Sequence, residues 1–312
     1  MTAAMADPNS GAERIGEDAQ AGALQLAALR QSIEQRLVQL ANPEGGAATR
    51  MVSQAMNYAL LAPGKRVRPV LTLLACTQMG GQPAKALDGA CAIEMVHTAS
   101  LILDDLPCMD DAQLRRGLPT THRAHGEAAA LLAAIGLLNR AYAVLAHAFG
   151  LQPPQKVALL ARLTAAVGVD GLIDGQALDL RERVGFRGIE AVDELNRLKT
   201  GSLFAAALEF GAICAGAEDF RVEAMGQAGL RIGLAFQTMD DLLDQTHAAA
   251  QLGKDANKDG AKPSIASLGG QDEARLRVRQ DIAAALELAA AQGGKTEPLR
   301  AFLLNLFGAA LP

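Results

Sequence analysis

Apolar residues recur at intervals of three and four along almost the whole chain, and this helical period limits the fold more than any other feature of the sequence. The first stripe consists of Leu26, Leu29, Ile33, Leu37 and Leu40. Similar segments, divided mainly by Gly and Pro, predict helices at about 48–61, 69–79, 84–105, 122–149, 154–166, 170–182, 189–198, 201–215, 219–246, 272–291 and 296–308. The sequence therefore predicts an all-α protein.

The composition agrees with close-packed helices. Ala and Leu dominate, aromatic residues make up only 3 % and Trp is absent, which disfavours a β-sandwich. Nothing reads as a run of strands, no internal repeat is found, and no linker is long enough to separate two domains. We expect a single large helical domain over residues 21–312, preceded by a disordered arm over residues 1–20.

Charge and composition also exclude several classes of function. With a net charge of −5 and no basic tract, the chain offers no surface for nucleic acid. The N-terminal stretch lacks the apolar core of a signal peptide, and no stretch reaches about 18 apolar residues without a charge, so we expect no membrane span. The cysteines are far apart in apolar segments, which favours reduced thiols and a cytoplasmic location. They are Cys76, Cys91, Cys108 and Cys214.

An apolar run, ASLIL, is followed directly by DDLPCMDDAQLRRG at residues 104–117. On an ideal helix the residue one turn after Asp104 is Cys108, which is a poor magnesium ligand. Pro107 removes a helix hydrogen bond and clashes with the preceding turn, so we expect the backbone to bulge and to return Asp110 to the face of Asp104. Two arginines follow within reach of a bound anion.

A second acidic motif, FQTMDDLLDQT, places Asp240 and Asp244 one turn apart on an otherwise apolar helix. Two carboxylates at this spacing repel each other unless a cation lies between them, and they suit Mg²⁺ together with phosphate oxygens. Either motif alone is more typical of a solvated helix face or a helix cap. Together with the basic stretches at 62–69 and 251–264, however, the pair predicts a metal–diphosphate site.

Six segments in a fixed order resemble the trans-isoprenyl diphosphate synthases, and are most similar to the bacterial farnesyl and geranylgeranyl diphosphate synthases. They are GKRVRP, EMVHTASLILDDLPCMDDAQLRRGLPTTH, GLIDGQALDL, KTGSLF, FQTMDDLLD and GKDANKDGAK, between about Gly64 and Ser264. The resemblance implies the isoprenoid synthase fold, a helical bundle around a central cavity, and a homodimer. It also implies the reaction: an allylic diphosphate loses pyrophosphate, isopentenyl diphosphate attacks the resulting carbocation, and a proton leaves.

The resemblance also implies roles for residues at matching positions. Three Mg²⁺ ions are implied, held by Asp104, Asp105, Asp110, Asp240, Asp241 and Asp244. The residues implied for the allylic diphosphate are Arg115, Lys199, Lys254 and Lys262. Those implied for isopentenyl diphosphate, which binds without metal, are Lys65, Arg68, His97 and Arg116. Thr200 and Gln237 are implied to face the developing carbocation, and Gln176 and Asp179 to support Lys199 from a polar cluster.

Plainer interpretations stay open for several of these residues. His97 lies on a mostly apolar helix, where a buried core histidine is more common than a ligand. Lys254 and Lys262 also fit a solvated loop, and Gln237 also fits a hydrogen bond between two helices. We expect Arg66 to face solvent.

Product length is predicted from the residues just before the first acidic motif. Ala99, five residues or about 7.5 Å up the helix from Asp104, and Ser100, four residues before Asp104, are both small. In related farnesyl-forming enzymes a bulky aromatic near these positions stops chain growth, so we expect a geranylgeranyl (C20) product, with Met95 among the residues that close the pocket. The alternative is a farnesyl (C15) synthase. The intact aspartate motifs disfavour a non-catalytic regulatory subunit, and the all-aspartate second motif disfavours a terpene cyclase.

Overall fold

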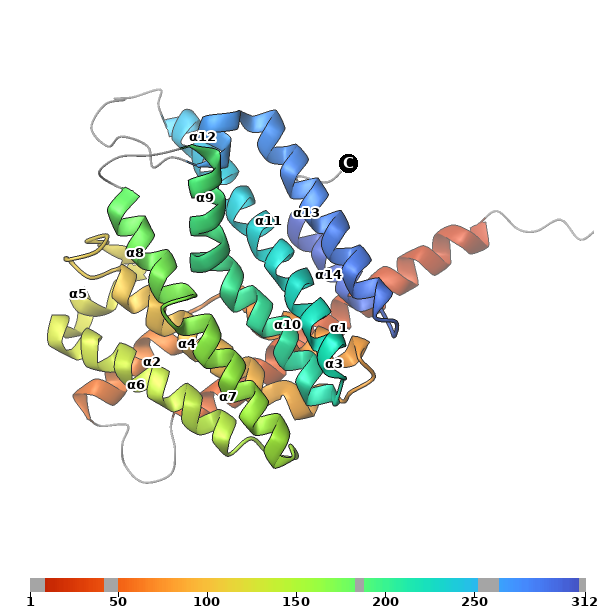
Figure 1. Ribbon diagram of the computed structural model, residues 1–312, viewed down its shortest axis with the longest axis horizontal. Coiled ribbons are helices and arrows are strands. Elements are labelled where there is room, and N and C mark those ends of the chain that lie inside the picture. Colours follow the sequence, from red (N-terminus) through yellow and green to blue (C-terminus); the bar gives the residue numbers. More distant parts are fainter. Residues whose placement is uncertain (1–8, 42–49, 183–187, 252–263, 309–312) are drawn as a thin grey trace, which may run out of the picture.

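The structure is a computed structural model that describes residues 9–41, 50–182, 188–251 and 264–308 (Figure 1). Its helices are α1 Asn9–Ala41, α2 Met51–Leu60, α3 Val67–Gln78, α4 Pro83–Asp104, α5 Thr121–His125, α6 Glu127–Ala146, α7 Pro153–Val167, α8 Leu172–Glu182, α9 Ile189–Asn196, the π-helix η2 Arg197–Gly201, α10 Ser202–Ala215, α11 Asp219–Gln251, α12 Ile265–Gly269, α13 Gln271–Ala291 and α14 Glu297–Phe307. The prediction of an all-α fold is confirmed. Helix α1 begins at Asn9, and so includes residues for which the composition predicts a disordered arm.

Two helix boundaries differ from the expected ones. The segment 122–149 is expected to be one helix but forms α5 and α6, because Gly126 lies between them with a φ of 86°, a conformation that favours glycine. Conversely, the expected break between 198 and 201 is absent, since α9, η2 and α10 follow one another directly. The π-helix η2 occupies the place of that break and carries Lys199 and Thr200.

One short hairpin departs from the all-helical prediction. Strands β1 Leu114–Arg115 and β2 Leu118–Pro119 pair antiparallel. The two residues between them, Arg116 and Gly117, have φ of 54° and 79°, as a tight I′ hairpin turn requires. Strands of this length contain too little alternation of apolar and polar residues to be recognised in a sequence. The hairpin presents the two arginines that follow the first acidic motif.

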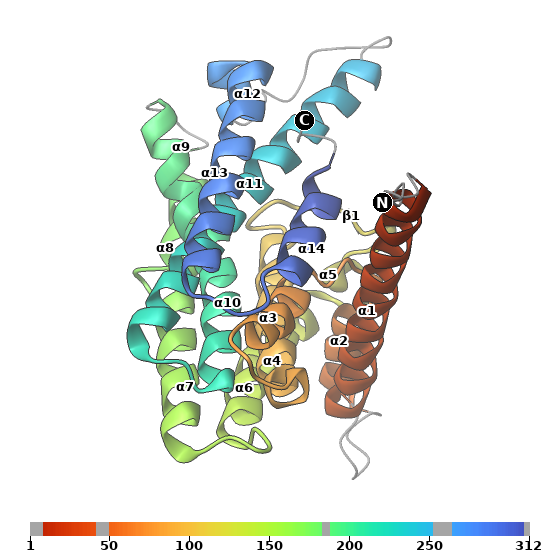
Figure 2. The same cartoon turned by 90° about the vertical axis from the view of Figure 1, so that its right-hand side faces the viewer.

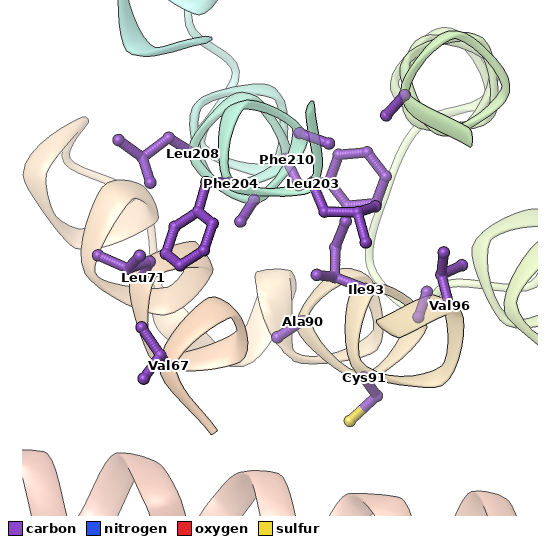
Figure 3. Packing of buried hydrophobic residues seen from close by; sticks show 14 of the residues in the cluster. Val67, Leu71, Ala90, Cys91, Ile93, Val96, Leu203, Phe204, Leu208 and Phe210 are labelled. Carbon is purple, nitrogen blue, oxygen red and sulfur yellow. The ribbon is translucent and has the colours of Figure 1, made fainter. Parts of the chain in front are cut away.

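The core is centred on α4 and α10, which are enclosed mainly by α3, α6, α7 and α11. Figure 3 shows Phe204 of α10 beside Leu71 of α3, and Phe210 of α10 over Ile93 of α4. All four side chains are buried. Helix α1 runs along one edge of the molecule next to α2 (Figure 2) and also contacts α3, α4 and α14. The four cysteines are all unpaired, as expected.

Glycines bring α10 and α11 into backbone contact. A Cβ atom at Gly229 would lie 2.4 Å from the carbonyl oxygen of Phe204, and one at Gly233 would lie 2.8 Å from the Cα of Gly201. Neither position has room for a side chain. This close approach places the second acidic motif, which lies further along α11, next to the π-helix.

No stretch of 18 residues is free of charge, but some helices are apolar enough to qualify as membrane spans when up to two charged residues are allowed. By length and composition alone, three helical segments of the described chain qualify: Pro83–Asp104, Glu127–Ala146 and Ile189–Ala215. The bundle accounts for the first and third, because 72 % and 78 % of their most apolar windows are buried inside it. In Glu127–Ala146, which is α6, only 44 % is buried. Its large exposed apolar residues are Leu131, Leu132 and Ile135.

Candidate active site

A cavity of about 660 Å³ lies where the carboxyl end of α4 meets the start of α3, the β1–β2 hairpin, α8, η2, α10 and α11. The predicted site residues that line it are Lys65, Arg68, His97, Ser100, Asp104, Arg115, Arg116, Gln176, Lys199, Thr200, Gln237 and Asp240. Its apolar wall includes Leu101, Leu172, Leu203 and Phe236. The cavity thus combines a dense set of charges with a hydrocarbon surface.

The two ends of the first acidic motif, Asp104 and Asp110, lie close together, but no bulge in a continuing helix is involved. Helix α4 ends at Asp104, and the backbone N–H of Asp110 donates a hydrogen bond to the Asp104 carbonyl at 2.9 Å. Pro107 prevents the helix from continuing, and Asp111 takes a left-handed φ of 46°. The backbone therefore returns Asp110 to Asp104, but the end of the helix brings this about and not the expected bulge.

Lys199 lies against this motif. Its Nζ is 2.7 Å from Asp179 and 3.5 Å from Asp104, and the side-chain amide of Gln176 also donates to Asp104. Burial raises the pKa of Asp104; the Lys199 ammonium opposes this rise, and the carboxylates of Asp110 and Asp179 add to it. Negative charge therefore accumulates at this end of the cavity, where an added cation is stabilised.

The π-helix aims Lys199 and Thr200 at the cavity. A Cβ atom at Gly175 of α8 would lie 2.3 Å from the backbone nitrogen of Lys199. Helix α8 can therefore approach η2 this closely only because residue 175 is Gly. A single turn of π-helix is rare in proteins and frequently marks a functional site.

The second acidic motif faces the π-helix. The Thr200 hydroxyl donates to Gln237 Oε1 at 2.9 Å, and Gln237 Nε2 donates to Asp241 Oδ1 at 3.0 Å. Gln237 thus makes the interhelical hydrogen bond considered from the sequence, and it also lines the cavity. Asp240 lines the cavity as well, so one carboxylate from each acidic motif borders the same space.

Asp105 does not border the main cavity. It is 3 % exposed, accepts hydrogen bonds from Arg115 at 2.5 and 3.0 Å, and borders a second cavity of about 30 Å³. Burial disfavours the charge on Arg115, but the hydrogen bond and charge of Asp105, together with the charges of Asp104 and Asp110, outweigh burial and raise the pKa of Arg115. In this arrangement Asp105 holds Arg115 at the cavity wall.

Some predicted site residues are not placed by the structure. Lys254 and Lys262 lie outside the described residues. The backbone of Asp244 belongs to α11, but its side chain also lies outside what the structure describes. Asp110 is exposed.

Arg68 and His97 form the buried part of the opposite, basic wall. Burial lowers the pKa of Arg68 to about 10, which keeps it charged at neutral pH, and its guanidinium lies 4.3 Å from the centre of the Phe204 ring. Its Nη1 is 3.4 Å from His97 Nε2. Burial, together with neighbouring arginines, holds the pKa of His97 well below its usual value, so the imidazole is neutral. Among the described residues Arg68 Nε has no hydrogen-bond partner.

Arg66 is the clearest error of the sequence interpretation. It was expected to face solvent but is 3 % exposed and bonded to Glu34 and Glu94. Burial disfavours its charge, but the two carboxylates outweigh burial and raise the pKa of Arg66. The sequence signal that is available is Glu94, a carboxylate on a predicted helix whose other residues are largely apolar.

Arg116 reaches the basic wall across Gly64. A Cβ atom at Gly64 would lie 2.6 Å from Nη1 of Arg116, so the guanidinium occupies space that any larger residue at 64 would take. Arg116 also has a left-handed φ of 54°. The hairpin and the α2–α3 turn are therefore fitted to each other.

The three residues predicted to limit product length do not lie together. Ser100 lines the cavity, and its hydroxyl donates to the carbonyl of His97 at 2.8 Å. Ala99 and Met95 are 5 % and 0 % exposed and belong to the packed core. Leu172 and Leu203 instead line the apolar wall.

Magnesium suits the donors at this cavity. Among the described residues no group of three or more His, Cys, Asp or Glu side chains is close enough to hold a metal alone. Asp104 and Asp240 nevertheless border one space, and Mg²⁺ characteristically takes one or two carboxylates and completes its shell with water and phosphate oxygens. The residues present therefore fit a metal that binds together with a diphosphate.

Comparison with known proteins gives a consistent result. Residues 49–269 match the family model described as polyprenyl synthetase. A geranylgeranyl diphosphate synthase from Pseudescherichia vulneris is 41 % identical over 290 residues, which cover 91 % of this chain and 92 % of that protein. A geranylgeranyl diphosphate synthase from Pantoea ananas is 43 % identical over 257 residues, covering 82 % and 83 %.

Solved structures agree with the sequence comparison. A geranyltransferase from Legionella pneumophila has a TM-score of 0.83 and 31 % identity, with 94 % of this chain and 99 % of that chain covered. An FPP/GFPP synthase from Zymomonas mobilis has a TM-score of 0.81 and 30 % identity, covering 92 % and 99 %. The likeness extends over nearly the whole bundle, which confirms the expected fold.

Proposed function

The chain belongs to the polyprenyl synthetase family, and from this premise we propose that it is a magnesium-dependent prenyltransferase that condenses an allylic diphosphate with isopentenyl diphosphate to give mainly geranylgeranyl diphosphate. The observation that carries the proposal is the single cavity bordered by Asp104, Asp240, Lys199 and Arg68 together with an apolar wall. A prenyl diphosphate has the same two parts, a multiply charged diphosphate head and a hydrocarbon tail.

In this proposal the acidic motifs and Lys199 receive the allylic diphosphate. The two acidic motifs would hold the three Mg²⁺ ions that the family resemblance implies, and these ions would supply Lewis acidity toward the departing pyrophosphate. Lys199, held by Asp179, places an ammonium at the same end of the cavity. Arg115, held by Asp105, adds a guanidinium. These fixed charges orient the diphosphate so that its tail lies along the apolar wall.

The second diphosphate does not leave, so fixed cations are sufficient to hold it. Lys65, Arg68 and Arg116 supply them, and all three line the cavity. Neutral His97 can accept from Arg68 through Nε2 and donate from Nδ1. The isopentenyl double bond is thereby oriented toward the allylic carbon.

Bond formation requires that the allylic cation react with the isopentenyl double bond before water attacks it. Thr200 and Gln237 place side-chain oxygens on the cavity wall near the second motif, where their dipoles stabilise positive charge. Leu203 and Phe236 exclude water from the tail. The proton lost after condensation goes to the released pyrophosphate, so no side chain of this wall is required as the base.

The metal requirement is tested with purified protein, farnesyl diphosphate and isopentenyl diphosphate. We expect Asp240→Asn to lower kcat by at least about a hundredfold, and EDTA to abolish turnover until Mg²⁺ is restored. In a thermal melt, Mg²⁺ with pyrophosphate should raise Tm of the wild type but not of the variant. Asp272→Asn, at an exposed position of α13, is the control and should behave as wild type. Turnover that survives EDTA contradicts the proposal.

Product length is tested by chromatography after incubation with the C5, C10 and C15 allylic starters. The relatives named geranylgeranyl diphosphate synthase support a C20 product. A farnesyl product is the alternative, because a similar solved structure is named an FPP/GFPP synthase. A C15 product that is not extended when farnesyl diphosphate is supplied would establish the alternative.

A homodimer is part of the proposal. Leu131, Leu132 and Ile135 form an exposed apolar face on α6, a helix whose most apolar window is only 44 % buried. Such a face is stabilised when a second copy covers it. Sedimentation equilibrium should give twice the chain mass of 32.4 kDa, and a monomer at micromolar concentration would contradict this part of the proposal.

A further inference from the structure

Arg66 is a buried arginine whose three side-chain nitrogens are all bonded. Nε donates to Glu34 Oε1 and Nη1 donates to Glu94 Oε1, each at 2.7 Å. Nη2 donates to the carbonyls of Leu60 and Ala62 at 3.1 and 2.9 Å. The guanidinium therefore joins α1, the end of α2 and the middle of α4 at one point.

The backbone of Arg66 is also unusual. Its φ is 48°, in the left-handed region that non-glycine residues seldom adopt. Arg66 is the N-cap of α3, so its conformation sets the direction in which the chain enters that helix. Lys65, which precedes it, and Arg68, two residues after it, line the main cavity, as do Arg66 and Val67. A conformation of this kind persists only when surrounding contacts impose it, and here the side-chain bonds of Arg66 do so.

Glu94 extends the same network toward the cavity. It is 2 % exposed and lies on α4 one turn before His97. Its charge favours the protonated forms of Arg68 and Arg116, opposing the burial that lowers their pKa. Arg66 in turn neutralises Glu94, which would be a costly buried charge without it.

We propose that Arg66 is a positioning residue for the isopentenyl diphosphate site, and that Glu34 makes the N-terminal helix α1 part of that site. The inference rests on the proposed function, since it names a substrate of the same cavity. All three side-chain nitrogens of Arg66 bond to the protein, and its neighbours bind the diphosphate. It fixes the turn from which Lys65 and Arg68 extend, and it does not participate in binding the allylic diphosphate.

The test is Arg66→Lys. A lysine has one nitrogen and cannot bond to two carboxylates and two carbonyls at once, so the turn is released while the charge is kept. We expect the KM for isopentenyl diphosphate to rise about tenfold, with the KM for farnesyl diphosphate and kcat changed by less than about threefold. A residue that only stabilised the fold would lower Tm and leave the ratio of the two KM values unchanged.

Arg36→Lys is the matched control. Arg36 also lies on α1 and pairs with a residue of α4, Asp88, at 2.8 Å, but it does not contact the α2–α3 turn. The substitution is the same and it also weakens the α1–α4 contact. We expect a comparable fall in Tm with no selective change in either KM.

Glu34→Gln provides a second, milder variant. The Glu34 side chain is 44 % exposed, so the substitution leaves no buried charge unpaired and the protein folds even if Arg66→Lys does not. We expect the KM for isopentenyl diphosphate to rise about twofold to fourfold. An unchanged KM ratio in Glu34→Gln, or in a folded Arg66→Lys, overturns the inference. A wild-type chain that condenses nothing overturns the proposed function instead.

Discussion

Arg66, Asp111 and Arg116 are the described non-glycine residues with positive φ, and all three lie in the segments that build the site. Each such conformation costs about 1–3 kcal/mol and is kept only where the surroundings impose it. At Arg66 two carboxylates impose it; at Asp111 the turn after Pro107 does so. Strain of this kind cannot be inferred from residue types, because arginine and aspartate are ordinary members of solvated loops.

The sequence predicts site residues well where chemistry restricts the choice of side chain. Asp104, Asp240 and Lys199 border the cavity because only carboxylates and cations suit a metal and a diphosphate. It fails where a partner distant in sequence decides, as with Arg66, which binds Glu34. Such pairings depend on how helices pack, and no local spacing encodes them.

Ser100, rather than Ala99, borders the cavity, and this makes a prediction about product length. Ser100→Phe puts a ring into the space that the growing tail occupies, so the main product should shift from C20 to C15. Ala99→Phe, one residue earlier, points its ring into the core and should lower Tm, with about 1–3 kcal/mol of overpacking, before it alters length. Product chromatography and melting curves check both.

The result for either variant can contradict this interpretation. C20 output from Ser100→Phe would remove that residue from the role. Shortening by Ala99→Phe in a folded protein would show that the tail enters between α4 and the helices packed on it, where Ala99 is buried in the core.

At the scale of elements, the helices are predicted because the apolar period of three and four persists over many turns. The β1–β2 hairpin and the π-helix η2 are not, since each comprises only a few residues and is defined by backbone hydrogen bonds without a period of its own. Both elements nonetheless carry site residues, Arg115 and Lys199 among them. Irregular elements therefore carry several of the site residues, and the regular helices surround them.

The contact between α8 and η2 gives a prediction at this scale. Gly175→Ala adds a Cβ that would lie 2.3 Å from the Lys199 backbone nitrogen, so η2 must shift and Lys199 moves away from Asp104. A displacement of about 1 Å is enough to lower kcat about a hundredfold. Steady-state kinetics on the folded variant measure the effect.

Gly22→Ala is the control for this substitution. It introduces the same methyl group into helix α1, at a position with nothing within 4 Å, and it should leave kcat unchanged with stability equal or slightly higher. If the two variants have equal kcat, the close approach of α8 is not needed to place Lys199.

At the scale of the whole molecule, the fold brings together two acidic motifs that are far apart in the sequence. The resemblance to a family predicts that meeting, and the cavity shared by Asp104 and Asp240 is consistent with it. Packing alone does not reveal it from the sequence, because the close α10–α11 contact depends on Gly229 and Gly233 meeting particular backbone atoms. Pairwise fits of this kind become visible only in three dimensions.

Global stability should depend on pH through Glu209, which links α10 to Arg162 of α7 at 3.0 Å. Burial raises the pKa of Glu209 to about 7 from 4.5. A raised carboxyl pKa favours the protonated folded state, so its contribution is complete below about pH 4.5 and is lost as pH rises through about 7. Between pH 5 and pH 8 the free energy of unfolding should fall by about 2 kcal/mol from this group.

Denaturant unfolding of Glu209→Gln checks this expectation. The glutamine does not titrate, so its stability relative to wild type should increase steadily across that range. Glu194→Gln removes an exposed carboxylate that is paired with Arg197. The pKa of Glu194 is lowered, so this carboxylate titrates below the range. The difference in stability between Glu194→Gln and the wild type should therefore stay constant. A constant difference for Glu209→Gln as well would exclude a titration near pH 7.

Arg116 packs against Gly64, so the residues tolerated at these two positions, which are far apart in the chain, depend on each other. Any mutation at 64 that adds a side chain displaces the guanidinium at 116, so its cost to fitness depends on which residue occupies 116. We therefore expect the residues tolerated at 64 and at 116 to depend on each other, and a library that randomises both positions together tests this expectation.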